Sequence, residues 1–376
     1  MLNGVTYFSA ADDVGGRELW RTDGTEPGTL HVRDINPGRG HGLDSDNVMA
    51  VFDGALYFAA DDGTNGIELW RSDGTEAGTV LVKNINGAGS SLPGSFTAFN
   101  GLLYFSANDG ANGIELWKTD GTEAGTQIVA DINPGSANAS PFHLVVFNGA
   151  LYFSARDVAS GSELWKTDGT AIERVKDIEA GSASSAPYDP VVFDGALFFV
   201  AETGASGIEL WKSDGTEVGT VQVTGVATGM FSSLEQLTVA NDTLFFVATN
   251  ADGDELWKSD GTAAGTVQVR DIRDGVGGSS VQELVAFSGA LYFTADDGIA
   301  GRELWKSDGT AAGTVMVKDI RAGSVGSNPA GLVVSGGKLY FLANDGFNGT
   351  ELWVSDGTEA GTQLLQDIYP GPVDPP

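Results

Sequence analysis

The stretch Glu-Leu-Trp-Lys-Ser-Asp-Gly-Thr-Ala-Ala-Gly-Thr at residues 303–314 decides the fold, because close copies of it run through the whole chain. Glu-Leu-Trp occurs eight times, at spacings of 46 to 50 residues. It contains all eight tryptophans: Trp20, Trp70, Trp117, Trp165, Trp211, Trp257, Trp305 and Trp353. Asp-Gly-Thr follows every copy, beginning at Asp23, Asp73, Asp120, Asp168, Asp214, Asp260, Asp308 and Asp356. A fixed period of this length is the signature of a repeat architecture.

One clear repeat runs from Phe142 to Ile178 and contains four short segments rich in β-branched and aromatic residues. Glycine, asparagine, aspartate and serine separate these segments, which predicts four strands. Asn148-Gly149 predicts a type I′ hairpin between the first two strands, because both residues accept a positive φ. No segment has helical periodicity. Eight such units favour a β-propeller over an open stack, since ring closure protects the edges of sheets, and a parallel solenoid needs shorter repeats.

We therefore predict an all-β fold, in which residues 1–376 form a single eight-bladed β-propeller domain with four antiparallel strands in each blade. The repeat cores are expected near residues 1–36, 47–86, 96–133, 142–179, 189–226, 235–273, 283–321 and 332–369. An innermost strand of the Val-Val-Phe type is found in seven repeats, whereas only Leu2-Asn3-Gly4 aligns with the end of an eighth. One blade is therefore expected to have three strands or to be completed by sequence outside these residues.

Composition and charge exclude several classes of protein. The chain has 51 acidic and 20 basic residues, a formal charge of -31, which repels nucleic acid and anionic lipid surfaces. No run approaches 18 apolar residues, so no membrane insertion is expected. Without cysteine there is neither a disulfide framework nor a thiolate metal site. The first residues do not form a signal peptide, so an export signal is not present in this sequence.

Residues 303–314 resemble a bacterial repeat named for its consensus ELWxxDGTxxGT, which occurs in large secreted or surface proteins. The resemblance covers the whole chain. It implies a propeller and an extracellular or cell-surface location in a bacterium, and it brings no catalytic residue. The Ser-Asp-Gly-Thr turn is also similar in part to the Asp-box of sialidase-type propellers, in which the aspartate and glycine close a hairpin at the outer edge.

The tryptophans and the glutamates that precede them have two interpretations each. An indole face can stack on a sugar ring, but recurrence at one blade position beside leucine favours packing between blades. The glutamate can act as a ligand or an acid. Its recurrence in every blade favours a repeated hydrogen bond or ion pair, for which the lysine or arginine after tryptophan is one partner.

The loop between the second and third strands is the candidate metal site. Six blades place an aspartate at the same position: Asp12, Asp62, Asp109, Asp157, Asp297 and Asp345. Thr203 and Asn250 take its place in two blades. Clustered aspartate and asparagine oxygens around glycine turns suit calcium, although the pattern is not that of an EF-hand. The other interpretation is an Asx turn that closes the hairpin without an ion.

Catalysis needs unlike groups that converge on one substrate, whereas the polar residues here repeat almost identically. The three histidines, His31, His41 and His143, occupy different blade positions and form no metal triad pattern. No cofactor is required by any motif, and no catalytic residue is assigned. The departures from symmetry, in the loop of the first blade and in blades four and five, are where a specific site would lie.

We interpret the chain as a non-catalytic, acidic, multivalent binding or scaffolding module that recognises carbohydrate or protein outside the cell, with calcium as a candidate aid. It is expected to be a monomer or part of a longer chain. Two alternatives stay open: a propeller enzyme of the glycosidase or lyase type with a site at the channel mouth, and a structural spacer within a longer surface protein.

Overall fold

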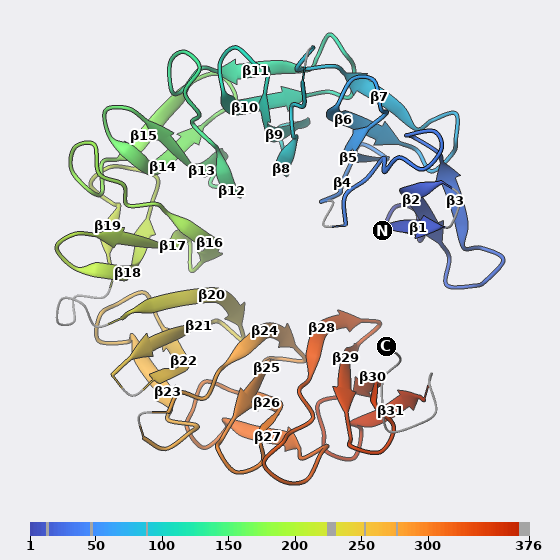
Figure 1. The fold of residues 1–376 in the computed structure, drawn as a ribbon. Coiled ribbons are helices and arrows are strands. Elements are labelled where there is room, and N and C mark those ends of the chain that lie inside the picture. Colours follow the sequence, from blue (N-terminus) through green and yellow to red (C-terminus); the bar gives the residue numbers. More distant parts are fainter. Residues whose placement is uncertain are drawn as a thin grey trace. The chain divides into compact units, whose positions relative to one another are not determined.

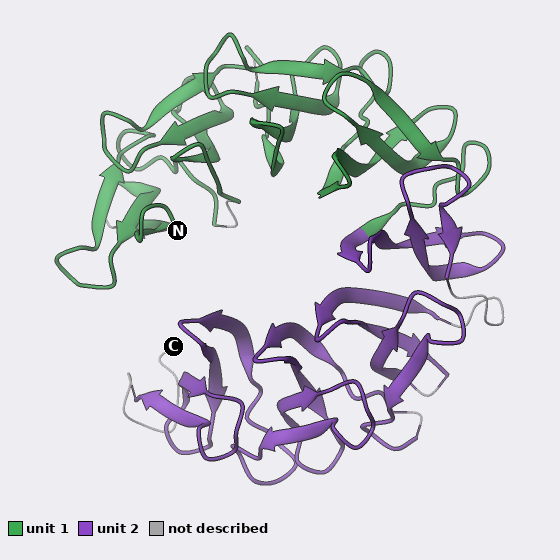
Figure 2. Cartoon of the chain, turned by 180° about the vertical axis from the view of Figure 1, so that it is seen from behind, with its two compact units in different colours: residues 1–188 green, residues 189–376 purple. Residues whose placement is uncertain are grey.

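A computed structural model describes residues 1–12, 15–45, 48–87, 89–223, 231–251, 253–275 and 277–367. Every element of regular structure in these ranges is a β-strand (Figure 1). The strands form eight sheets, which are the blades of an eight-bladed β-propeller fold, as the repeats predict. The chain divides into two compact units, residues 1–188 and 189–376 (Figure 2).

The first unit contains blades 1 to 4. Blade 1 has three strands, β1 (Thr6–Asp12), β2 (Gly16–Thr22) and β3 (Leu30–Arg33). Blade 2 comprises β4 (Ala50–Phe52), β5 (Ala55–Asp61), β6 (Ile67–Ser72) and β7 (Val80–Lys83). Blade 3 comprises β8 (Gly94–Phe99), β9 (Leu102–Asn108), β10 (Ile114–Thr119) and β11 (Gln127–Ala130). Blade 4 comprises β12 (Phe142–Phe147), β13 (Ala150–Asp157), β14 (Gly161–Thr167) and β15 (Ile172–Lys176).

The second unit begins within the first strand of blade 5 and contains blades 5 to 8. Blade 5 comprises β16 (Tyr188–Phe193), β17 (Ala196–Thr203), β18 (Gly207–Ser213) and β19 (Val221–Gln222). Blade 6 comprises β20 (Ser233–Ala240), β21 (Thr243–Asn250), β22 (Gly253–Ser259) and β23 (Val267–Arg270). Blade 7 comprises β24 (Gln282–Phe287), β25 (Ala290–Asp296), β26 (Arg302–Ser307) and β27 (Val315–Lys318). Blade 8 comprises β28 (Ala330–Ser335), β29 (Lys338–Asn344), β30 (Thr350–Ser355) and β31 (Gln363–Gln366).

Consecutive strands pair antiparallel within each blade. The first strand of a blade in the chain is its innermost strand, and the last is its outermost. The first hairpin closes as its sequence predicts: Phe147 pairs with Ala150, and Asn148 and Gly149 have φ of 47° and 75°. Two positive φ angles match the right-handed twist of the strands that they connect.

Blades of the same unit pack face to face because alternate residues of a strand point to opposite faces. Two clusters that share blade 2 illustrate this. One face of blade 2 packs against blade 1, through Leu56, Phe58 and Trp70 on Leu19 and Val32. Its other face packs against blade 3, through Tyr57, Leu69 and Val82 on Leu103, Phe105 and Trp117. Blades 6 to 8 repeat the same arrangement. The hydrophobic core is therefore divided into layers between blades.

Basic side chains join several blades to the main chain of the next blade, and we call them the latch residues. One set follows the tryptophan and donates to a glycine carbonyl of the next Asp-Gly-Thr turn at 2.7 to 3.0 Å: Arg21 to Gly74, Lys212 to Gly261, Lys258 to Gly309 and Lys306 to Gly357. The other set ends the outermost strand and donates to a threonine carbonyl at 2.6 to 2.7 Å: Arg33 to Thr79, Lys83 to Thr126, Arg270 to Thr314 and Lys318 to Thr362.

Candidate functional site

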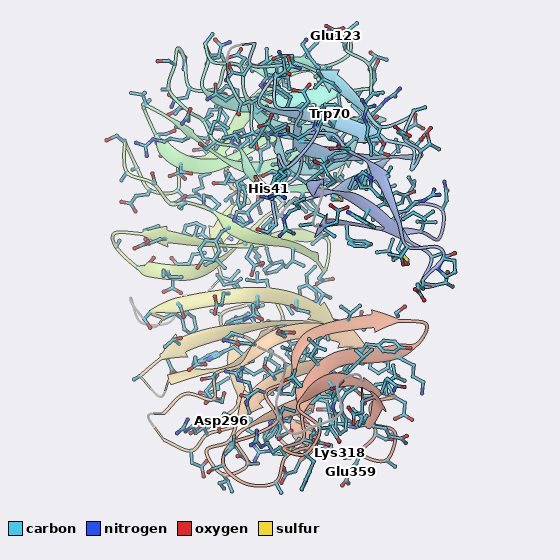
Figure 3. The ribbon with its side chains drawn as sticks, turned by 45° about the vertical axis from the view of Figure 1, so that its right-hand side comes forward. His41, Trp70, Glu123, Asp296, Lys318 and Glu359 are labelled. Atoms are coloured by element: carbon cyan, nitrogen blue, oxygen red, sulfur yellow. The ribbon has the colours of Figure 1, made fainter. Side chains whose placement is uncertain are left out.

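The tryptophans lie between blades. Trp70, which Figure 3 labels, is only 4% exposed and packs against residues of the preceding blade. Trp305 is 3% exposed, and the guanidinium of Arg270 lies 5.9 Å from its ring centre. Trp20 and Trp165 are half-buried. Rings held in this way bury most of their stacking faces inside the protein, which leaves little indole surface for a sugar.

In six blades, the glutamate before the tryptophan anchors the loop that leaves its own blade. Glu255 has no exposed surface, and its carboxylate accepts hydrogen bonds from the amide of Ile272 at 3.1 Å and from the amide and hydroxyl of Ser279 at 3.0 and 2.8 Å. Glu18, Glu68, Glu115, Glu163 and Glu303 accept equivalent bonds from both ends of their loops. The repeated partners are therefore main-chain amides and serine hydroxyls, and the lysine or arginine after tryptophan serves as a latch residue instead.

Burial raises the pKa of five of these glutamates, although the hydrogen bonds that their carboxylates accept oppose the shift: Glu18, Glu115, Glu163, Glu255 and Glu303. The pKa of Glu115 and of Glu255 is raised from the ordinary value of 4.5 to about 7. An acid whose pKa is raised by folding stabilises the fold below its unfolded pKa, and this contribution is lost as the pH rises through the folded pKa.

We expect the free energy of unfolding to fall between pH 5 and pH 8, and to fall less in a Glu115→Gln, Glu255→Gln double variant. The reason is that these two raised pKa values lie in that window and the glutamine side chain does not titrate. Urea unfolding of both proteins at several pH values measures the difference. Parallel pH profiles would contradict the assignment.

The Asp-Gly-Thr turns are closed by their own side chains. Asp73 accepts hydrogen bonds from the amide and hydroxyl of Thr75 at 2.9 and 2.7 Å, and the Thr75 hydroxyl in turn accepts one from the Gly78 amide. A Cβ at Gly78 would overlap the Asp73 carboxylate. In blade 4 the amides of Ala171 and Thr170 and the Thr170 hydroxyl lower the pKa of Asp168 to about 2. The other turns repeat this bonding, at Asp23, Asp120, Asp214, Asp260, Asp308 and Asp356. These aspartates are structural parts of the turn.

The six aspartates of the candidate calcium loops all accept hydrogen bonds within their own turns. Asp109 accepts bonds from the amides of Ala111 and Asn112 and from the Asn112 side chain, at 2.7 to 2.9 Å. Similar bonds are made by Asp12, Asp62, Asp157, Asp297 and Asp345. This is the geometry of the Asx turn. Among the described residues, no group of three or more histidine, cysteine, aspartate or glutamate side chains could hold a metal ion.

The histidines lie apart in the first unit and have structural contacts. His31 packs on Trp20, with ring centres 5.3 Å apart, and His143 lies against the ring of Phe142 at 4.5 Å. His41 accepts a hydrogen bond through Nδ1 from the Arg17 amide at 2.9 Å. The same bond is accepted by Ser90, Asn138 and Ser184 in the following blades. His41, labelled in Figure 3, thus replaces a serine or asparagine of the repeat.

The asymmetric loop after blade 1 borders an open cavity of about 410 Å³, which we call the groove. It is lined by Asp44, Ser45, Val48, Ala59, Ile67, Leu92, Pro93 and Gly94. A smaller cavity of about 70 Å³ adjoins it beside His41 and shares Asp44, Ala59 and Ile67. The stretch from Gly42 to Phe52 is two residues longer than the matching stretch from Ser91 to Phe99. In accordance with this, β4 has three residues where β8 has six. Of the departures in blade 5, Gly225-Val226 and Met230 lie outside the described residues, whereas the shortened turn of blade 4, Ala171 to Arg174, is described.

Leu92 is the unusual residue of the groove. Its φ is +51°, and its side chain is 57% exposed. Four of the later loops, after blades 3, 4, 6 and 7, have φ between 43° and 52° at the same position, with Ser140, Ala186, Ser280 and Asn328 there. A bulky side chain rarely adopts this conformation, which favours asparagine and glycine. Val48 is also 63% exposed. Leu92 and Val48 together give the rim of the groove an exposed apolar surface.

Comparisons with known proteins find weak structural likenesses and one matching family. No curated protein matches it. The computationally designed Ika8 protein is 16% identical with a TM-score of 0.49, over 86% of this chain and 87% of that one. A puromycin hydrolase is 14% identical with a TM-score of 0.49, over 86% of this chain and 55% of that one. A Mycobacterium tuberculosis puromycin-hydrolysing peptidase is 10% identical with a TM-score of 0.47, over 85% of this chain and 53% of that one. The chain thus spans about half the length of both peptidases, and likenesses this weak say nothing about activity.

No helix of the described residues is long and apolar enough to cross a membrane.

The profile of one protein family matches residues 5–248, which is more than half of the chain and includes the whole groove. The chain therefore belongs to the family described as outer membrane protein assembly factor BamB.

Proposed function

We propose that this protein is a non-catalytic binding module that holds an extended segment of a partner protein in the groove at blades 1 to 3. The observation that carries the proposal is Leu92, an exposed leucine in a strained backbone conformation at the edge of an open cavity. Membership of a family described by its part in assembly supports a protein as the partner.

The bonding of the repeated polar residues also supports a binding role. The glutamates bond to their loops, the turn aspartates to their turns and the tryptophans pack between blades. The repeated polar groups that the structure describes are thus used for folding, and buried indoles do not offer the open face that stacking on a sugar needs. Protein is therefore favoured over carbohydrate as the ligand, and no contact in the groove favours the enzyme alternative. A location outside the cell remains part of the proposal.

A crosslinking experiment tests this function. A photoreactive amino acid is placed at Val48, in the groove, and at Ser280, which occupies the Leu92 position of the loop before blade 7. We expect one partner protein to be crosslinked from Val48 and not from Ser280, with the crosslinked peptide identified by mass spectrometry. Equal crosslinking from both positions, or none from either, would refute the groove as the binding site.

The Leu92→Asn variant separates binding from stability. Asparagine tolerates a positive φ, and Asn328 already occupies the same position in another loop. We expect the melting temperature of the variant to stay the same or rise, while crosslinking from Val48 is lost. A variant that keeps its partner would show that the leucine side chain has no part in binding.

A further inference from the structure

Six innermost strands have one residue in the left-handed region, and in five of them the ladder shifts register there and forms a β-bulge. The six residues are Ser95, His143, Asp189, Gln236, Glu283 and Gly331, with φ between 53° and 67°. In β8 the ladder pairs Gly94 with Ser106 and then Thr97 with Tyr104, which leaves two residues opposite one. Blades 6 and 8 show the same register shift. The amides of the bulge and of the next residue lie outside the ladder and can form an anion-binding nest.

In the second unit, a side chain of the preceding innermost strand fills the nests at Gln236, Glu283 and Gly331. Glu283 accepts hydrogen bonds from the amides of both Gly331 and Leu332, at 3.0 and 2.8 Å. Asp189 accepts one from the Leu237 amide at 2.7 Å, and the Gln236 side chain accepts one from the Leu284 amide at 3.4 Å. Two of these three acceptors are carboxylates, so the protein itself shows that a carboxylate on a neighbouring extended strand can occupy this bulge.

The nest of β8 lacks such a side chain. Its amides belong to Ser95 and Phe96, and no side-chain acceptor for them is found among the residues that the structure describes. The preceding strand is the shortened β4, and the position that corresponds to Glu283 is occupied by Val48, which is apolar and exposed. Val48 and Gly94, the residue directly before the nest, both line the groove. An external segment in the groove could thus reach these amides.

We propose that the nest at Ser95 and Phe96 binds the side-chain carboxylate of an aspartate or glutamate in an extended segment of the partner. This inference rests on the proposed function of the groove. The segment would take the place that Glu283 and its strand take beside blade 8, with apolar residues of the segment against Leu92, Pro93 and Val48. Asp44 and the net charge of -31 oppose an acidic ligand, so salt should strengthen the binding by screening them.

The natural strand supplies the probe. A fluorescent peptide with the sequence of residues 280–287, Ser-Val-Gln-Glu-Leu-Val-Ala-Phe, blocked at both ends, carries the carboxylate of Glu283 in its own context. We expect it to bind the full chain, and the same peptide with glutamine for glutamate to bind about ten- to hundredfold more weakly, since hydrogen bonds to a charged group are lost. A third peptide, with alanine for glutamate and an unblocked C-terminal carboxylate, tests whether a terminal carboxylate serves equally well.

Variants of the protein complete the test. Val48→Glu places a carboxylate at the position from which Glu283 reaches the nest at Gly331. We therefore expect the new glutamate to fill the nest at Ser95 and the variant to bind the peptide no longer. Val48→Leu, which keeps the position apolar, is the matched control and should bind as the parent does. Melting curves of both variants confirm that they fold.

The proposal is overturned if the glutamine peptide binds as tightly as the glutamate peptide, if the C-terminal carboxylate alone restores binding, or if Val48→Glu keeps its affinity. None of these outcomes affects the crosslink from Val48 to the partner protein. If that crosslink persists, the groove binds the partner by apolar contacts alone. Loss of that crosslink with a glutamate-dependent peptide would instead refute the protein partner and leave the nest intact.

Discussion

Replacing Trp305 by alanine is expected to lower the free energy of unfolding by about 3–5 kcal/mol, the usual cost of emptying a buried aromatic site. Trp305 is 3% exposed and packs in one cluster with Val269 and Ile272 of the preceding blade. The variant also loses the contact with the Arg270 guanidinium. Urea denaturation followed by circular dichroism measures the change.

Phe347 provides the matched control for this experiment. It is an aromatic residue on a hairpin loop of the same unit, but it is 80% exposed. Phe347→Ala should therefore change the free energy of unfolding by no more than about 0.5 kcal/mol. If both alanine variants had equal stability, the tryptophan could not be part of the layer between blades.

The Glu255→Ala variant is expected to be destabilised to a similar extent, by about 3–5 kcal/mol. The substitution removes the acceptor of three hydrogen bonds and leaves the Ile272 amide and both donors of Ser279 buried without it. The same denaturation experiment measures the effect, and the loop from Ile272 to Ser279 should also lose protection against amide exchange.

Glu359 is the control for the glutamate. It lies exposed in the turn after Asp356 and is labelled in Figure 3. Glu359→Ala should remain within about 0.5 kcal/mol of the parent. An equally small effect of Glu255→Ala would mean that the loop is held by other contacts, and the anchoring role would have to be abandoned.

The sequence predicts the fold because its signals are local and are repeated. The Asn-Gly turns, the alternation of Leu-Tyr-Phe strands and the Asp-Gly-Thr turns act over a few residues each, and eight copies reinforce the same interpretation. The three-stranded first blade could also be anticipated, because Leu2-Asn3-Gly4 stands where an innermost strand should end. The resemblance to the ELWxxDGT repeat and the exported location stay predictions.

The candidate site could be predicted only in part, because its decisive properties are not local. The extra residues before Phe52 are visible in the sequence, but the positive φ of Leu92 follows from how its loop is held by Glu68 and by the Ile67 carbonyl. The partners of the glutamates lie 15 to 24 positions away. The bulges appear in the sequence only as an unremarkable residue four positions before the end of each innermost strand, so the nests could not be recognised.

The acceptors of the latch residues have a consequence for how such a chain can change over time. Arg33 and Lys318 donate to main-chain carbonyls of the following blade, and so does Lys306. A main-chain carbonyl is present whatever side chain the residue carries, so a latch residue can engage any blade that folds in the same way. Gene duplication or exchange of whole repeats would therefore preserve these contacts without compensating substitutions, while each blade keeps its own loops to diverge.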